Sequence, residues 1–278
     1  MAPWCIGGKP VSSELTTGAE SERSGAVRRS DQFVEAFAKG LQVIRSFPVQ
    51  RAAATLAEIA QTAGLPRATA RRMLLTLVEL GYATQDGDRF SLTPKLLDLG
   101  FSYLNSIPFY RSAQDVLEAL ASELNELCSL SILDGVHTVY VIRVQGREFL
   151  RHGMGVGTRL PAYATSFGRV LLAALEPDQR EELLRKSKLE KLTPNTLTER
   201  SGLMREIERA ARDHYSLVVE ELDLGIIGLS VPVRARRGKV VAAAGISFNP
   251  ARFSKRAALE HYLPRLREAA ERIGSQLA

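Results

Sequence analysis

The stretch that decides the fold of the N-terminal third of the chain is TLAEIAQTAGLPRATARRMLLTLVELGYATQDGDRFSL, residues 55–92. Thr55, followed three residues later by Glu58, forms a capping-box signature that begins a helix. Gly64 can take the left-handed backbone conformation that closes this helix, and Pro66 suits the first turn of a second one. Apolar residues at helical spacing predict a buried stripe in that second helix, made of Ala70, Met73, Leu74, Leu77 and Val78. The pattern therefore predicts two helices joined by a tight turn.

The face opposite the stripe is basic. Arg67, Arg71 and Arg72 lie near the start of the second helix, and no acidic residue occurs in it before Glu79. Positive charge at the start of a helix suits contact with phosphates and base edges. The second helix is therefore predicted to bind an anionic partner.

A β-hairpin follows the second helix. Strand-forming residues at 82–84 and 89–92 flank the dipeptide Asp86-Gly87, which is typical of a tight turn. Helix, turn, basic helix and hairpin together indicate a winged helix for DNA binding. The residues expected to contact DNA are Thr55, Pro66, Arg67, Ala68, Thr69, Arg71, Arg72, Thr76 and Arg89. The alternative is a purely structural pair of helices whose arginines form a solvated surface.

Composition sets the broad class. A chain of 278 residues with 45% hydrophobic and 24% charged residues is typical of a globular protein of about two domains. The net charge of +6 favours an anionic partner without choosing between nucleic acid, a membrane surface and an acidic ligand. Cys5 and Cys128 form no disulfide framework, which favours a reducing compartment. With no secretory signal and no apolar run long enough to span a bilayer, we expect a cytoplasmic protein.

Changes in pattern divide the chain into four segments. Residues 1–30 are rich in Ser, Gly, Thr and Glu without a period and are predicted to be a disordered tail. Residues 31–93 hold a first helix, at 31–47, and the winged helix-turn-helix domain. Residues 94–107 form a short apolar helix, predicted to be a linker that pairs with another subunit or, alternatively, packs on its own domain. Residues 108–278 form the second domain.

The second domain mixes helices with strands. Helical spacing is found at 113–127, 166–174, 177–186, 201–214 and 255–277, and strand patterns at 128–133, 138–144, 149–152, 217–220, 228–233 and 240–248. Hairpins interleaved with helices predict one antiparallel sheet flanked by helices, an α+β fold of the GAF/PAS-like sensor type. The whole chain is thus predicted to be a multi-domain protein with a mainly α N-terminal domain.

Signatures of catalysis are absent from the sequence. Gly153, Gly155 and Gly157 lack the spacing of a dinucleotide-binding loop, and the four histidines lack metal-ligand spacing. No nucleophile elbow, P-loop or HExxH motif occurs. We therefore predict no catalytic residue, no metal and no cofactor.

The second domain does offer a candidate anion site. The helix that begins near Ser166 and Phe167 presents free backbone N–H groups, and Arg143, Arg147, Arg151 and Arg159 lie on segments that lead to it. An aromatic acid could place its ring against Leu160, Tyr163 or Phe167 and face the small residues Gly228, Ser230, Gly245 and Ser247. Glu220, at the end of a predicted strand, completes this expected lining. The alternative is that the arginines are surface residues and the glycines serve packing.

Three long stretches resemble the IclR family of bacterial transcription regulators. GLPRATARRMLLTLVELGY resembles the family's recognition helix, RLPAYATSFGRVLLA its effector-domain signature, and GLSVPVRARRGKVVAAAGIS its paired late strands. The resemblance covers residues 31–278. Within the family, FVEAFAKGLQVIRSF and PRATARRMLLTLVELGYA are most similar to the subgroup that controls aromatic-acid catabolism through the β-ketoadipate pathway.

The resemblance implies a dimer, or a dimer of dimers, on a palindromic operator and an organic-acid effector such as protocatechuate, 4-hydroxybenzoate or β-ketoadipate. By position, it implies an effector pocket made of His152, Leu160, Ser166, Phe167, Val218, Gly228, Gly245 and Ser247. Val218, Gly228, Gly245 and Ile227 stand where the family often has polar groups. We expect this loss to enlarge the pocket and make it more apolar, which favours an aromatic acid over a small oxoacid.

The favoured hypothesis is thus a ligand-responsive transcriptional regulator that binds double-stranded DNA and a small organic acid. The first competing hypothesis is an enzyme that converts such an acid and carries an accessory winged helix. The second is a structural DNA-binding protein without a ligand. Conversion of a candidate acid would favour the enzyme, and DNA binding insensitive to any acid would favour the structural protein.

Overall fold

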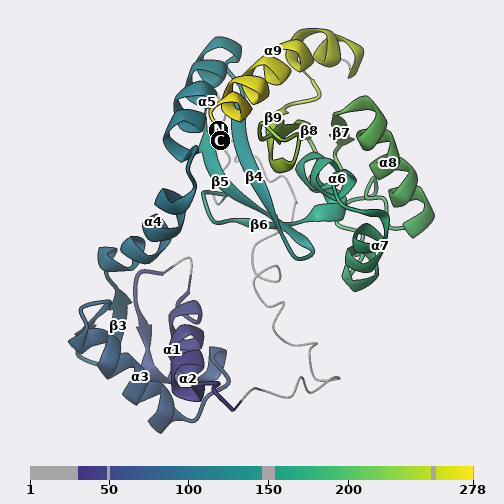
Figure 1. Ribbon diagram of the computed structural model, residues 1–278. Helices are drawn as coiled ribbons and strands as arrows, with labels where there is room; N and C mark the ends of the chain where they lie inside the picture. Colours follow the sequence, from purple (N-terminus) through teal and green to yellow (C-terminus); the bar gives the residue numbers. More distant parts are fainter. Residues whose placement is uncertain (1–30, 49–50, 146–153, 252–254, 278) are drawn as a thin grey trace, which may run out of the picture. The chain divides into compact units, whose positions relative to one another are not determined.

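The computed structural model describes residues 31–48, 51–145, 154–251 and 255–277 (Figure 1). The predicted tail at 1–30, the predicted strand at 149–152, and Arg147, Arg151 and His152 lie outside the described residues. The chain divides into two compact units, residues 1–98 and 99–278, and the division falls inside helix α4 (Leu97–Ser106).

The first unit is a winged helix, as predicted. Its elements are α1 (Glu35–Arg45), β1 (Ala54–Thr55), α2 (Leu56–Thr62), α3 (Arg67–Glu79), β2 (Ala83–Asp86) and β3 (Arg89–Leu92). The three strands form an antiparallel sheet in the order β1-β3-β2. Its core is made of Val43, Ile59, Leu74, Leu77 and Phe90, and so includes part of the predicted stripe of α3.

The local signals in the helix-turn-helix operate as predicted. The Thr55 hydroxyl accepts a hydrogen bond from the Glu58 backbone N–H at 3.3 Å, and the Thr55 N–H donates to the Glu58 carboxylate at 2.8 Å. The hydrogen bonds that the Thr55 N–H and hydroxyl donate to the Glu58 carboxylate are the main cause that lowers the pKa of Glu58. Gly64 has a φ of +59°, the left-handed conformation expected after α2.

The hairpin differs from the prediction by one residue. Asp86 pairs with Arg89, so the two turn residues are Gly87 and Asp88 rather than Asp86 and Gly87. Gly87 has a φ of +57° at the first turn position, where a tight hairpin turn favours glycine. The two-residue strand β1 was not predicted, because two residues carry no alternation that a sequence pattern could reveal.

The second unit is built on a six-stranded antiparallel sheet in the order β6-β5-β4-β9-β8-β7, as the α+β prediction required. Its strands are β4 (Leu127–Asp134), β5 (His137–Val144), β6 (Arg159–Pro161), β7 (Ser216–Val219), β8 (Ile227–Arg234) and β9 (Val240–Phe248). The edge strand β6 was not predicted, because it has only three residues and contains Pro161, which a sheet tolerates at its edge.

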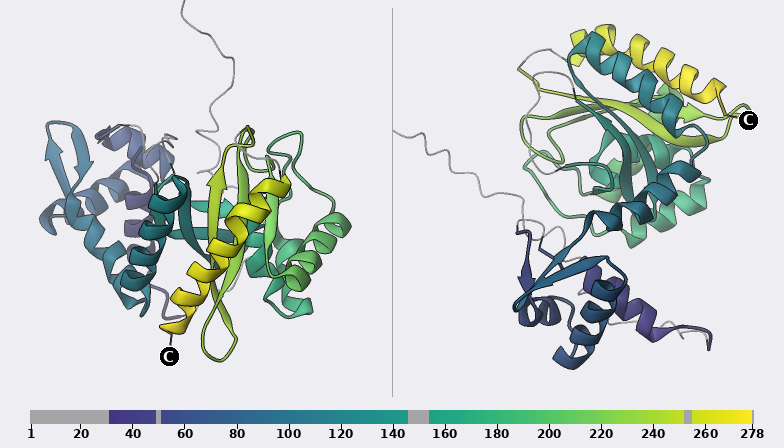
Figure 2. Two further views of the ribbon diagram at one scale, coloured as in Figure 1. Left: turned by 90° about the horizontal axis from the view of Figure 1, so that it is seen from above. Right: turned by 90° about the vertical axis from the view of Figure 1, so that its left-hand side faces the viewer.

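Helices cover both faces of this sheet (Figures 1 and 2). Helices α5 (Tyr110–Leu124) and α9 (Lys255–Ser275) lie side by side on one face and share the main hydrophobic core with it. Helix α6 (Ser166–Ala173) packs on the other face and contacts α8 (Arg200–Asp213), with α7 (Pro177–Lys186) between them in the chain. Short 3-10 turns at Pro94–Leu96 and Ala162–Ala164 precede α4 and α6.

Buried polar residues tie the helices to the sheet. The Tyr262 hydroxyl on α9 donates a 2.8 Å hydrogen bond to the carboxylate of Glu126, and both side chains are buried.

Among the described residues, no helix is long and apolar enough to cross a membrane.

Candidate DNA-binding surface and effector cavity

The predicted DNA-contacting side of α3 faces solvent. Arg67, Arg71 and Arg72 are exposed, and within the described part of the chain none of them forms an ion pair. No side chain caps the start of this helix at Pro66, so its first N–H groups are open to a phosphate. Of the remaining residues predicted on α3, Ala68 and Thr76 are exposed and Thr69 is half-buried.

Besides Pro66, which directly precedes α3 and is exposed, two predicted residues lie outside this helix, opposite each other in the small sheet. Arg89 is exposed on β3 and pairs in register with Thr55 on β1. The Thr55 hydroxyl is already engaged by Glu58, to which it also donates at 3.0 Å. Arg89 is therefore the residue of this pair whose side chain is available to a phosphate.

In the second unit, a cavity of about 50 Å³ lies at the start of α6. Thr165 caps this helix, since its hydroxyl accepts a 3.0 Å hydrogen bond from the Gly168 N–H. The predicted effector residues that line the cavity are Ser166, Phe167, Val218, Gly228 and Ser247. The structure thus brings together residues from α6, β7, β8 and β9.

Five other predicted effector residues do not line this cavity. Leu160 packs in the cluster around Phe167, and the Tyr163 hydroxyl donates to the Glu190 carbonyl at 2.7 Å. Glu220 lies in the turn after β7, where its carboxylate accepts the Gly225 N–H at 2.7 Å. The other two, Ser230 and Gly245, are packing positions beneath α6.

The expected enlargement of the pocket at the two glycines is wrong. A Cβ added at Gly245 would lie 2.6 Å from the Phe167 ring and 2.5 Å from the Ser230 hydroxyl. A Cβ at Gly228 would lie 2.7 Å from the Ser166 hydroxyl, which is hydrogen-bonded to Ser230 at 2.7 Å. The missing side chains let α6 approach the sheet closely, so the space is filled rather than left to a ligand.

The cavity also contains residues that the sequence did not single out together. Arg143 and Tyr140 both line it, and the Arg143 guanidinium lies 4.7 Å from the centre of the Tyr140 ring. The Tyr140 ring meets the Phe167 ring edge-on at 5.5 Å. Burial raises the pKa of Tyr140, and the nearby Arg143 partly opposes this shift.

A β-bulge explains why Tyr140 and Arg143 share a face. Strict alternation along β5 would turn residues 140 and 143 to opposite sides of the sheet. The register shifts between Leu130 and Ser131, which pair with Ile142 and Tyr140, so that Val141 is an extra residue. The sequence predicts only that Arg143 lies on a segment leading to the site. It does not predict that Arg143 shares a face with Tyr140, because a bulge has no signal in a single sequence.

A buried ion pair lies beside the effector cavity, which Glu221 lines and its partner Arg169 does not. The Arg169 guanidinium on α6 donates to the Glu221 carboxylate at 2.7 Å, and their side chains are 2% and 11% exposed. The Leu197 N–H also donates to this carboxylate, at 2.8 Å. Thr193 and Thr196 hold the adjacent backbone carbonyls, each at 2.6 Å. The pair thereby fastens the turn after β7 to α6. The sequence signal for a buried ion pair here is the arginine inside the apolar run SFGRVLLA.

Neither the buried cysteine nor the acidic and histidine side chains of the described residues offer a nucleophile or a metal site. Burial raises the pKa of the Cys128 thiol to about 12, so it stays protonated and is a poor nucleophile at neutral pH. Among the described residues, no group of three or more His, Cys, Asp or Glu side chains could hold a metal ion. The geometry combines an exposed basic helix in one unit with a small, partly cationic cavity in the other, which is the arrangement of a DNA-binding protein with a ligand-binding domain.

Comparison with known proteins gives the same class. Residues 36–87 match the family model of the IclR helix-turn-helix domain, and residues 101–275 match that of the bacterial transcriptional regulator IclR C-terminal domain. The chain belongs to the IclR family of bacterial transcriptional regulators. These comparisons give no support to the enzyme hypothesis.

Two curated relatives are similar over nearly their whole length. The Pca regulon regulatory protein of Pseudomonas putida is 34% identical over 97% of this chain and 94% of its own. The p-hydroxybenzoate hydroxylase transcriptional activator of Acinetobacter baylyi is 33% identical over 88% of this chain and 92% of its own. These relatives support the resemblance to the subgroup that controls aromatic-acid catabolism.

A solved structure supports the fold. It is an IclR homolog from Microbacterium hydrocarbonoxydans complexed with 4-hydroxybenzoate, 27% identical, with a TM-score of 0.76 over 87% of this chain and 98% of that one.

Proposed function

We propose that this regulator binds a palindromic operator through α3 and the β2–β3 hairpin and that an aromatic carboxylic acid, bound in the cavity at the start of α6, controls this binding. The observation that carries the choice of ligand is the position of Arg143 over the Tyr140 ring, which meets the Phe167 ring edge-on, in a cavity that all three residues line. A guanidinium can bind a carboxylate through two hydrogen bonds, and the aromatic rings offer an apolar surface to a ring.

The electrostatics of the cavity support an acid over a neutral compound. Arg143 is the only cationic side chain among the described residues that line it, and within those residues it has no ion-pair partner. The start of α6 adds N–H groups and a positive dipole end. Glu221 is the one acid in the described lining, and its charge is balanced by Arg169.

The cavity must expand to hold such a ligand. One water requires about 10–15 Å³ of cavity, so about 50 Å³ corresponds to about four waters, whereas a hydroxybenzoate has ten non-hydrogen atoms. Leu222 and Ile226 belong to the turn after β7, which is outside the regular strands and is held by the Arg169–Glu221 ion pair. We infer that this turn moves when the ligand binds, which would give the two states that a ligand-controlled regulator needs.

We further propose that the regulator is a homodimer that uses α4. Leu97, Leu99, Phe101 and Tyr103 on this helix are between 50% and 60% exposed. Large apolar side chains clustered on a short helix indicate a surface that a partner covers. A two-fold dimer would also match the two half-sites of a palindromic operator, and binding to chromosomal DNA implies a cytoplasmic protein.

The experiment that tests this function is fluorescence anisotropy of labelled DNA from upstream of the regulator's own gene. Random DNA of equal length serves as the control, at two salt concentrations, with and without a panel of benzoates and dicarboxylic acids. We expect preferential binding to the upstream DNA and a shift in its affinity with a benzoate. Preferential binding that no acid alters would refute the effector proposal, and equal binding to both DNAs would refute the operator proposal.

A further inference from the structure

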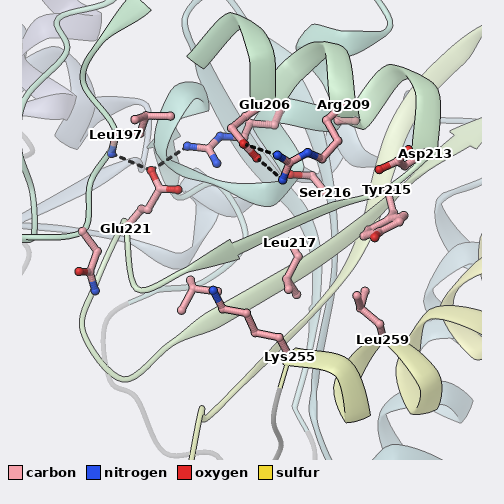
Figure 3. A pocket seen from close by; sticks show the side chains of 14 residues that line it. Leu197, Glu206, Arg209, Asp213, Tyr215, Ser216, Leu217, Glu221, Lys255 and Leu259 are labelled. Carbon is pink, nitrogen blue, oxygen red and sulfur yellow. Dashed lines mark hydrogen bonds and ion pairs between the residues drawn. The ribbon is translucent and has the colours of Figure 1, made fainter. Parts of the chain in front are cut away.

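A groove of about 660 Å³ follows the outer edge of β7, apart from the effector cavity (Figure 3). The edge strand contributes Ser216, Leu217 and Val219, while α8 and the start of α9 form the two walls. This volume lies in the range of ligand-binding sites, roughly 300–1,000 Å³. Within the described chain, Glu221 is the residue that lines both the groove and the effector cavity. Its ion-pair partner Arg169 lines the groove alone.

The groove presents backbone groups that the sheet does not use. The Glu220 N–H donates to the Ile226 carbonyl at 2.8 Å, which fixes the phase of the β7–β8 ladder. In an antiparallel ladder alternate residues direct their N–H and C=O groups to the same side. Val218 therefore faces β8, whereas the N–H and C=O groups of Leu217 and Val219 point outward along the groove.

Charges in the groove leave one acid and one base unpaired. Arg169 pairs with Glu221, and Arg209 pairs with Glu206 at 3.2 Å. Asp213 on α8 and Lys255 at the start of α9 have no ion-pair partner among the described residues. Figure 3 shows Asp213 beside Tyr215, and the Lys255 side chain reaching toward the Glu221 side of Leu217.

We propose that this groove is a second ligand site, which binds a short peptide in an extended conformation parallel to β7. The peptide backbone would pair with the outward groups of Leu217 and Val219, as in other cases of strand addition. Its ammonium group would bind Asp213 and its carboxylate Lys255. Three extended residues span about 10 Å, and β7 with its four residues spans about 13 Å, so a tripeptide with free ends matches the strand.

The test is isothermal titration calorimetry of the full-length protein with tri-alanine at neutral pH. We expect saturable binding of one peptide per chain. The substitutions Asp213→Asn and Lys255→Met are each expected to weaken it about tenfold, because each removes one charge-assisted hydrogen bond. Matched controls are Asp115→Asn and Lys191→Met, which change exposed charges outside the groove.

A second measurement does not depend on any variant. Tri-alanine with an acetylated amino end and an amidated carboxyl end keeps the backbone pairing but loses both charges, and should bind the wild-type protein at least tenfold more weakly. The proposal is overturned by absence of saturable binding, or by binding that neither the two substitutions nor the blocked ends weaken. It is also overturned if the protein self-associates through this edge, seen as concentration-dependent sedimentation that Asp213→Asn and Lys255→Met abolish. None of these measurements uses operator DNA or the aromatic acid, so the result is independent of the proposed function.

Discussion

Replacing Arg143 by methionine tests how the effector cavity recognises an acid. The change removes the only cation in the described cavity lining and keeps an unbranched apolar stem of similar reach against Tyr140. A hydrogen bond to a charged group contributes about 1.5–3 kcal/mol. Because the Arg143 side chain is only half-buried, we expect the lower part of this range, which corresponds to a roughly ten- to thirtyfold loss of affinity for the acid.

The assay is calorimetric titration with 4-hydroxybenzoate and with 4-hydroxybenzamide, which has the same ring without the negative charge. Wild-type protein should bind the acid more tightly than the amide, and Arg143→Met should reduce this ratio to about one while affinity for the amide changes little. Arg159→Met is the matched control, since Arg159 lies on the neighbouring strand β6, is exposed and pairs with Asp134. An acid-to-amide ratio that Arg143→Met leaves unchanged would refute the role of the guanidinium.

Three further predictions concern DNA binding and packing. Arg72→Ala should abolish the preference for operator over random DNA, whereas Arg89→Ala should weaken both alike and lower the salt slope by about one; equal losses on both DNAs for Arg72→Ala would contradict the first assignment. Gly245→Ala should destabilise the second unit by about 1–3 kcal/mol through overpacking, while Gly155→Ala, whose Cβ meets no atom within 4 Å, should not; equal thermal shifts for the two would show that the close packing of α6 is unimportant. Glu221→Gln leaves a buried guanidinium without a carboxylate and should cost about 3–5 kcal/mol in chemical denaturation, and a loss below about 1 kcal/mol would show that the ion pair does not hold the turn after β7.

Much of the fold follows from local sequence patterns. The helix-turn-helix is encoded by the Thr55–Glu58 capping box, by Gly64 and by the apolar spacing of α3, which all act within a few residues. Longer strands such as β4, β5 and β9 are visible because their runs of apolar and β-branched residues are bounded by turn residues. The same local reasoning found the start of α6 and the basic face of α3.

The effector cavity depended on contacts between residues far apart in the chain. A bulge in β5 places Arg143 with Tyr140, and its position is set by pairing with β4. The Arg169–Glu221 ion pair joins residues 52 positions apart, so the sequence near either residue does not indicate its partner. The absence of side chains at Gly228 and Gly245 predicted a larger pocket, but Ser166 and Phe167 occupy the space beside these glycines. Sequence by itself determined which helices and strands form, because their causes are local; the tertiary structure alone decided which side chains meet, because that depends on register and on how closely α6 packs on the sheet.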